Sequence, residues 1–188
     1  VFNTLDVPRG LTLYKSLASA GNVKGMTGVG VVLVEGLGVN NDEAEGSKWI
    51  VAASDKGYSQ AHFEMGTLLY TGAAAPHVKE NVNAAFKQFE KAAALNHTGA
   101  LYMTADMLYT GEGCEDSWDA GRAVRLLYQA GERGHRYARA TLLEWLRDEE
   151  VMASRLDVKE ETTKQLAAIK TQQSGWGHWF KSWICPVN

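Results

Sequence analysis

The sequence has few of the residues that mark a disulfide-bonded, zinc-binding or membrane-spanning protein. Its 188 residues include only two cysteines, Cys114 and Cys185, which stand 71 positions apart with no second pair near either. That spacing fits neither a disulfide framework nor a four-ligand zinc site. No stretch approaches the roughly 18 consecutive apolar residues of a membrane-spanning helix. The start, VFNTLDVPRG, lacks the basic region and apolar run of a secretory signal.

These absences leave the compartment open. We expect a chain that is soluble or peripheral to a membrane. The sequence begins with Val1 rather than Met. An upstream targeting segment for an organelle lumen or matrix could have been removed, or upstream residues could simply lie outside the given sequence, and both would leave the same first residue. The sequence therefore does not identify the compartment.

An excess of positive charge is also missing. The 19 basic and 22 acidic residues are interspersed and give a formal net charge of −3. A protein that neutralises a phosphate backbone concentrates positive charge on one surface, so nucleic acid is not an expected partner. Apolar residues make up 45% and charged residues 22%, close to the average of folded globular proteins. We expect a folded chain with a buried core.

Catalytic and metal-binding motifs are absent as well. None of the five histidines stands four positions from another, and no H-E-x-x-H motif occurs. His97 and His135 follow equivalent predicted helix ends, where a polar residue is unremarkable. No G-x-x-x-x-G-K-S/T motif or preceding strand supports a phosphate site at the glycine pairs. A Ser, His and acid triad stays open, because its members need only converge in space. We expect no cofactor, no metal and no enzymatic activity.

What the sequence does contain is an internal repeat, which decides the fold. The copies begin at Gly25, Ala61, Ala100 and Ala138, separated by 36, 39 and 38 positions. Five further columns keep the same phase in three copies: Gly30, Gly66 and Ala105; Leu33, Leu69 and Leu108; Gly36, Gly72 and Gly111; Ala53, Ala92 and Ala130; Gly57, Asn96 and Gly134. A period of this length predicts a stack of similar units.

Each copy is expected to form two helices. In the first helix, Ala61, Gly66 and Leu69 fall on one stripe, and the small residues let two backbones approach closely. Glycine at the Gly72 column ends it, because glycine readily adopts the left-handed conformation. The second helix alternates bulky and small residues up to the Gly57 column. The next copy begins almost at once, so neighbouring helices must pack antiparallel. The predicted fold is all-α, an α-solenoid of helix pairs.

The pattern A-x4-G-x2-L-Y-x-G, a variable loop, an aromatic residue four positions before an alanine pair, and a closing glycine resembles the Sel1-like repeat, a relative of the tetratricopeptide repeat. Copy three departs from it with Ala105 in place of glycine and a single Ala130. The resemblance implies an adaptor or scaffold in a multiprotein assembly. A secreted branch of the family pairs cysteines within each repeat, and this chain lacks those pairs.

The array is expected to begin and end on half-repeats. Leu13 aligns with Trp49 and Leu17 with Ala53, so the chain opens on the second helix of a repeat. The predicted organisation is a repeat array over residues 11–148, with a half-repeat at 11–21, copies at about 25–57, 61–96 and 100–134, and a half-repeat at 138–148. Residues 149–188 follow as a charged linker or helix and an aromatic tail.

Repeat arrays usually bind along the extended surface that stacking creates. We expect partner contacts from first-helix residues outside the repeat columns, namely His62, Phe63, Thr67, Tyr102, Met103, Asp106, Arg139 and Glu144. For the two aromatic residues among these, the alternative is that they fill the core between helices.

The tail carries an aromatic face, with Trp176, Trp179, Phe180 and Trp183 at i, i+3, i+4 and i+7. Such a face could cap the open end of the array, dock into a groove on a partner, or lie at a membrane interface. Little positive charge accompanies it, which favours a protein partner over anionic lipid.

We therefore predict a non-catalytic scaffold or adaptor for protein interactions. It would be a structural subunit of a larger multiprotein complex, with an organellar, membrane-associated complex as one setting, and peripheral membrane contact through the tail stays open. The alternative is a hydrolase or small-ligand-binding module that uses the concave surface of the solenoid. That function requires a deep pocket with convergent titratable groups.

Overall fold

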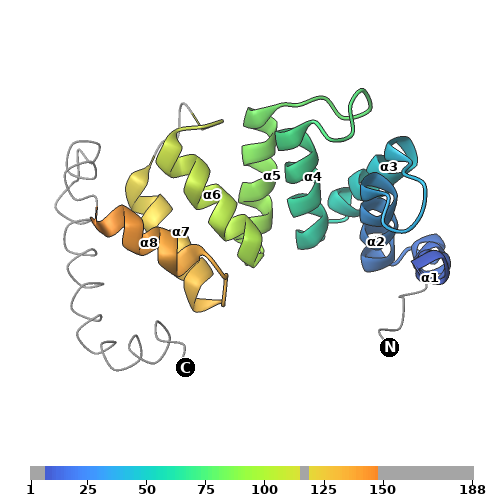
Figure 1. Cartoon of the computed structure of the whole chain (residues 1–188), viewed down its shortest axis with the longest axis horizontal. Helices are drawn as coiled ribbons and strands as arrows, with labels where there is room; N and C mark the ends of the chain where they lie inside the picture. Colours follow the sequence, from blue (N-terminus) through green and yellow to red (C-terminus); the bar gives the residue numbers. More distant parts are fainter. Residues whose placement is uncertain (1–6, 115–118, 148–188) are drawn as a thin grey trace, which may run out of the picture. The chain divides into compact units, whose positions relative to one another are not determined.

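The computed structural model describes residues 7–114 and 119–147, which form eight α-helices and no strand (Figure 1). The helices are α1 Val7–Ser19, α2 Val23–Glu35, α3 Glu43–Asp55, α4 Ser59–Thr71, α5 Val82–Ala94, α6 Thr98–Thr110, α7 Ala120–Glu132 and α8 Ala138–Arg147. The chain divides into two compact units, Val1–Leu142 and Leu143–Asn188. The first, called the repeat unit below, holds α1 to α7 and the start of α8. The predicted all-α fold is confirmed.

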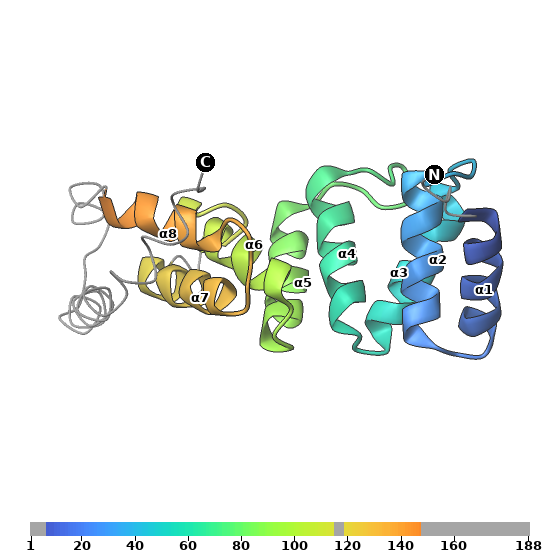
Figure 2. The same ribbon diagram turned by 60° about the horizontal axis from the view of Figure 1, so that its bottom comes forward.

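Helices of the repeat unit pack in pairs. The most extensive contacts join α2 with α3, α4 with α5, and α6 with α7. Figures 1 and 2 both show α2 beside α3 and α4 beside α5. Smaller contacts join α3 to α4 and α5 to α6, which link one pair to the next. Each copy is therefore one helix pair, as the repeat columns predict, with α2, α4 and α6 as first helices and α3, α5 and α7 as second helices.

Side-chain caps begin the second helices. The carboxylate or amide oxygens of Asp42, Asn81 and Asp119 accept the backbone N–H groups of the residues three positions on, at 2.8, 2.9 and 2.8 Å. Each cap satisfies a backbone donor that has no partner within the helix, which stabilises a helix by about 1 kcal/mol. The same cap thus recurs in all three copies.

Residues with a left-handed backbone conformation end the helices at the positions that the repeat columns predict. Gly36, Gly72 and Gly111 close the first helices with φ angles of 64°, 66° and 82°. After the second helices, Gly57, Asn96 and Gly134 have φ angles of 76°, 61° and 83°. Asparagine tolerates this conformation better than other non-glycine residues. The substitution of Asn96 into a glycine column therefore leaves the turn unchanged.

Small residues bring the two helices of a pair into close contact. A Cβ atom at Gly30 would lie 2.4 Å from Cγ1 of Ile50, and one at Gly66 would lie 2.6 Å from Cε1 of Phe89. In copy three, the equivalent positions hold Ala105 and Leu127, and both are completely buried. Leucine is smaller than phenylalanine and leaves room for the alanine methyl group. This pairing explains why copy three departs from the glycine of the repeat pattern.

The half-repeat at the N-terminal end forms α1, which begins at Val7 rather than at the predicted residue 11. Pro8 lies in its first turn, where a proline is tolerated because backbone N–H groups there have no partner within the helix. The sequence interpretation stopped short of this turn. At the other end, α8 spans Ala138–Arg147 and lies within the half-repeat expected at residues 138–148.

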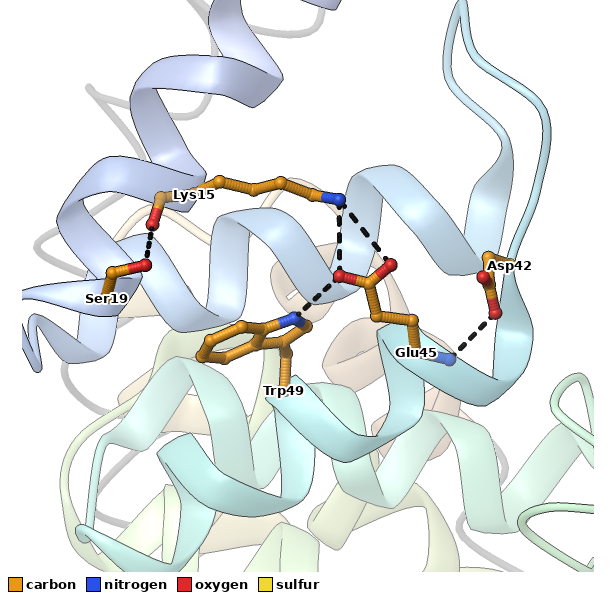
Figure 3. A network of polar contacts seen from close by, with 5 residues as sticks. All are labelled: Lys15, Ser19, Asp42, Glu45 and Trp49. Atoms are coloured by element: carbon orange, nitrogen blue, oxygen red, sulfur yellow. Dashed lines mark hydrogen bonds and ion pairs between the residues drawn. The ribbon is translucent and has the colours of Figure 1, made fainter.

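A polar network joins α1 to α3 (Figure 3). Nζ of Lys15 lies 3.2 Å from Oε1 of Glu45, and Nε1 of Trp49 donates to the same oxygen at 3.2 Å. The cap from Asp42 fixes the backbone of Glu45 at the start of α3. Glu45 therefore binds the half-repeat to copy one and orients the Trp49 ring at the same time.

Candidate partner-binding surface

Five of the predicted contact residues lie on α4 and α6 at positions that become equivalent between the two helices when Glu64, which was not predicted, is added to them. They fall at offsets that share one side of a helix. We call this set, with Glu64 included, the first-helix surface: Phe63, Glu64 and Thr67 on α4, and Tyr102, Met103 and Asp106 on α6. All six side chains are partly exposed.

His62 lies off this surface. It is 9% exposed, and its Nδ1 lies 2.9 Å from Oε1 of Gln88 on α5. The contact joins the two helices of copy two. His62 therefore contributes to the packing of its own repeat, and its predicted role in partner binding is not carried into the proposal below.

The two aromatic residues of the surface each stack on a histidine in the turn that leads to the next first helix. Phe63 stacks on His97 with ring centroids 4.5 Å apart, and Tyr102 stacks on His135 at 4.4 Å. Phe63 also contacts the ring of Phe89 at 5.7 Å. Both aromatic residues therefore pack between repeats, in line with the alternative considered for them, while part of each side chain stays exposed.

His97 connects copy two to copy three through both ring nitrogens. Its Nδ1 accepts the backbone N–H of Ala100 at 3.1 Å and caps α6, while Nε2 lies 2.8 Å from Oε1 of Gln60 on α4. Since Nδ1 accepts, the proton sits on Nε2, which donates to Gln60. Gln60 in turn donates to Oε1 of Glu64 at 2.6 Å. Burial lowers the pKa of His97, so the neutral ring that this network requires is favoured.

His135 occupies the same position before α8 without the cap. Its Nδ1 is buried and has no hydrogen-bond partner among the described residues. Burial lowers the pKa of His135 as well. Its ring contacts remain: it stacks on Tyr102, whose hydroxyl lies 3.4 Å from that of Thr141, and it meets the Tyr137 ring edge-on at a centroid distance of 6.3 Å. The two histidines thus share the aromatic contact and differ in their polar one.

Two half-buried carboxyl groups lie on the first-helix surface. Burial, followed by the charge of Glu35, raises the pKa of Glu64, although the hydrogen bond from Gln60 opposes this. Burial and the charge of Glu112 raise the pKa of Asp106. Both carboxylates are therefore poorly solvated, and no cation among the described residues offsets that cost.

The remaining predicted contacts lie on α8 or beyond it. Arg139 is exposed, and its Nη2 lies 3.7 Å from Oε1 of Glu132. Glu144 is exposed. The aromatic tail from Trp176 to Trp183 lies outside the described residues, so its role stays a prediction. Within residues 7–114 and 119–147, no helix is long and apolar enough to cross a membrane. No cluster of three or more His, Cys, Asp or Glu side chains suited to a metal ion occurs in the same ranges.

The family model for the Sel1 repeat matches residues 23–58, 59–97 and 98–135. The chain belongs to the Sel1 repeat family. Each matched range begins at the first residue of α2, α4 or α6 and ends in the turn that follows the second helix of the same pair. Sel1 repeat proteins generally act as scaffolds for protein interactions and are generally not enzymes.

Solved structures share the fold of this Sel1 repeat protein. It is similar to the Sel1 repeat protein from Oxalobacter formigenes at 24% identity, with a TM-score of 0.63 over 73% of this chain and 99% of that one. It is also similar to cysteine rich protein B of Helicobacter pylori at 18% identity, with a TM-score of 0.55 over 72% of this chain and 94% of that one. The comparison with curated proteins gave no match.

Sequence reasoning missed the roles of Gln60, Glu64 and His97. A signal for His97 was present, because it occupies the position before a first helix that Asn22 fills in copy one, where Asn22 caps α2. The signal for Gln60 and Glu64 was weaker. Their network depends on His97, which is 37 positions from Gln60 in the sequence and which folding brings to the N-terminal end of α4.

Proposed function

We propose that this Sel1 repeat protein is a non-catalytic scaffold, a structural subunit of a larger assembly, and that it holds a protein partner on the first-helix surface. Phe63 and Tyr102 would supply apolar contact area. Thr67 and Met103 would contact the partner beside them. The partner segment would present cationic side chains to Glu64 and Asp106.

The partly buried position of these two carboxyl groups on the first-helix surface carries the proposal, and burial raises the pKa of each. Burial that leaves a carboxylate without a cation costs folding free energy, which a bound arginine or lysine would recover. A charge-assisted hydrogen bond contributes about 1.5 to 3 kcal/mol. Stacking on histidine also holds Phe63 and Tyr102 in fixed positions, which lowers the entropy lost on binding.

Co-purification of the tagged full chain from its native source, followed by cross-linking, tests this function. The double variant Glu64→Gln, Asp106→Asn removes both charges and keeps the side-chain shapes. We expect it to retain at least tenfold less of a stable partner than the unmodified chain. Asp55→Asn is the matched control, because Asp55 is an exposed acid at the end of α3, away from the first-helix surface.

Two results would contradict the proposal. Recovery of the chain as a lone monomer with no stable partner would contradict the scaffold function. Equal retention of a partner by the unmodified chain and the double variant would leave the scaffold function standing and exclude Glu64 and Asp106 as the contact.

A further inference from the structure

The turns that precede the first helices differ in how they cap them. The equivalent positions hold Asn22 before α2, Tyr58 before α4, His97 before α6 and His135 before α8. The side-chain oxygen of Asn22 accepts the backbone N–H groups of Lys24 and Gly25 at 3.0 and 3.1 Å. Tyr58 makes no side-chain cap, and Nδ1 of His135 has no partner among the described residues. Of these four described positions, His97 alone combines a helix cap with a titratable group.

The cap of α6 requires one protonation state. Nδ1 of His97 accepts the backbone N–H of Ala100 at 3.1 Å, so this nitrogen carries no proton. Nε2 keeps its proton and donates to Oε1 of Gln60, 2.8 Å away. A proton taken up at Nδ1 would set two donors against each other and leave the N–H of Ala100 without its acceptor. The oxygen of an asparagine cap, such as Asn22, does not change with pH in this way.

The direct contacts of His97 are to neutral groups. Its ring stacks on Phe63 of α4 at 4.5 Å, and on the α6 side a Cβ atom at Gly99 would lie 3.3 Å from its Cε1. Its backbone N–H donates to the carbonyl oxygen of Ala92 in α5 at 3.0 Å. No ion pair involves His97 among the described residues. Nothing in direct contact therefore compensates the charge that a second ring proton would bring.

Two charged side chains reach His97 through a neighbouring residue. Glu64 of α4 accepts from Gln60 at 2.6 Å, and Nη2 of Arg133, at the end of α7, donates to Oδ1 of Asn96 at 2.7 Å. Their charges are opposite in sign. Burial is the cause that lowers the pKa of His97, so the folded chain protonates this ring only below the ordinary value of 6.5.

We propose that His97 is a pH-sensitive switch at the boundary between copies two and three. The neutral ring caps α6 and joins it to α4, and protonation releases the first turn of α6 while each helix pair stays packed. Phe63 and Gln60 contact the ring, and Glu64 is bonded to Gln60, so the change reaches the first-helix surface. The switch rests on the contacts of His97 and does not require the partner proposed above.

Nuclear magnetic resonance of the isotope-labelled full chain tests the switch without any partner. At about pH 8, the ring of His97 should be neutral and protonated on Nε2. As the pH is lowered to about 5, the ring should titrate, and the amide signal of Ala100 should follow the same curve. The protection of this amide from hydrogen exchange, relative to its intrinsic rate at each pH, should fall by about fivefold or more, the factor that one N-cap contributes. The amide of Gly25, which Asn22 caps, is the internal control and should keep its protection.

His97→Asn is the matched variant, because asparagine can cap α6 and does not titrate. In it, the Ala100 amide should be protected equally at both ends of the pH range. The proposal is overturned by a proton on Nδ1 at about pH 8, by a ring still neutral at about pH 5, or by a loss of Ala100 protection that the variant shares. Equal losses at Gly25 and Ala100 would also overturn it, because acid would then loosen the whole repeat unit. The scaffold function would stand in each case, since co-purification tests it separately.

Discussion

Contacts within a copy and contacts between copies share buried apolar packing, but the contacts between copies two and three add a set of polar and aromatic groups to it. Inside copy two, the ring of Phe89 lies against Gly66, and both are buried. Between copies two and three, Phe63 stacks on His97, the His97 ring donates a hydrogen bond to Gln60, and it accepts one from the backbone N–H of Ala100. Dry packing therefore predominates between the helices of a pair, and at the boundary between copies oriented polar and aromatic groups are added to it.

The difference has a consequence for binding. A dry, fully packed contact offers no exposed group to a partner, whereas the polar contacts between copies leave Glu64 and Phe63 partly exposed. The side chains that position successive copies are thus close to those proposed to hold a partner. Changes to the two kinds of contact should differ in their effect on stability, and that difference is measurable.

The largest effect is expected inside a copy. Phe89→Ala removes a ring that is 1% exposed and leaves a cavity between α4 and α5. We expect the free energy of unfolding to fall by about 3 to 5 kcal/mol, measured by urea denaturation. Lys87→Ala, at an exposed position of the same helix, is the control and should change it by less than about 0.5 kcal/mol. A loss below about 1 kcal/mol for Phe89→Ala would show that the pair is not held by dry packing.

The pairing of small and bulky residues can be tested by introducing the alanine and leucine pair of copy three at the equivalent positions of copy two. Gly66→Ala alone should cost about 2 kcal/mol, because its methyl group would meet Phe89 at 2.6 Å. Adding Phe89→Leu reproduces the Ala105 and Leu127 pair of copy three. We expect the double variant to be more stable than the sum of the single losses predicts. Strict additivity in the urea midpoints would contradict the explanation given for Ala105.

The contacts within copies were the part that the sequence predicted well. Their residues recur at a fixed period, so Gly30, Gly66 and Ala105 mark the close approach of two helices without any knowledge of the partner side chain. Helix ends were predicted for the same reason, because glycine or asparagine in a recurring column has a local conformational cause. Even the change to Asn96 follows from local chemistry.

The contacts between copies were predicted poorly, because they depend on pairs of residues far apart in the sequence. Gln60 and His97 are polar residues without a motif until folding brings the turn before α6 beside the start of α4. The aromatic residues Phe63 and Tyr102 were candidates for two roles, and their sequence positions could not separate them. The exposure of Leu13 and Leu17 was likewise hidden, since α1 has the sequence pattern of a buried helix.

A smaller loss than that of Phe89→Ala or Gly66→Ala is expected at the boundary between copies. His97→Ala removes the cap of α6 and the stack on Phe63, and should cost about 1 to 1.5 kcal/mol in urea denaturation. His97→Asn should recover part of this, because asparagine is a good N-cap residue. His77→Ala, at an exposed loop histidine, should have no effect. Equal losses for His97→Ala and His97→Asn would show that the stack matters and the cap does not.

The same histidine should make stability depend on pH. Burial lowers the pKa of His97 in the folded chain below the ordinary value of 6.5. The unfolded chain therefore takes up a proton first, so this contribution is fully present above pH 6.5 and is lost as the pH falls below it. His135 acts in the same direction. The raised pKa values of Glu64 and Asp106 have the opposite effect on stability, because these carboxyl groups take up protons in the folded chain first as the pH falls further.

His97→Asn isolates this contribution, since it leaves His135 and the carboxyl groups in place. Between pH 8 and pH 5.5, the unmodified chain should lose more stability than the variant, as measured by the urea midpoint at each pH. Parallel curves for the two chains would mean that His97 titrates at the same pH in the folded and unfolded states. The network with Gln60 would then not require a neutral ring.

The smallest effect is expected where α1 joins α3, although Lys15, Glu45 and Trp49 make a well-formed network there (Figure 3). The side chains of Lys15 and Glu45 are 43% and 41% exposed, so water screens their attraction. Lys15→Ala should lower the free energy of unfolding by less than about 0.5 kcal/mol and less still at high salt. Glu45→Ala should cost more, because it also removes the acceptor of the Trp49 hydrogen bond. If Lys15→Ala instead cost as much as His97→Ala, the half-exposed ion pair would stabilise the fold as much as the cap and ring stack of His97 do. Polar contacts between copies would then depend on charge rather than on the orientation of the groups that make them.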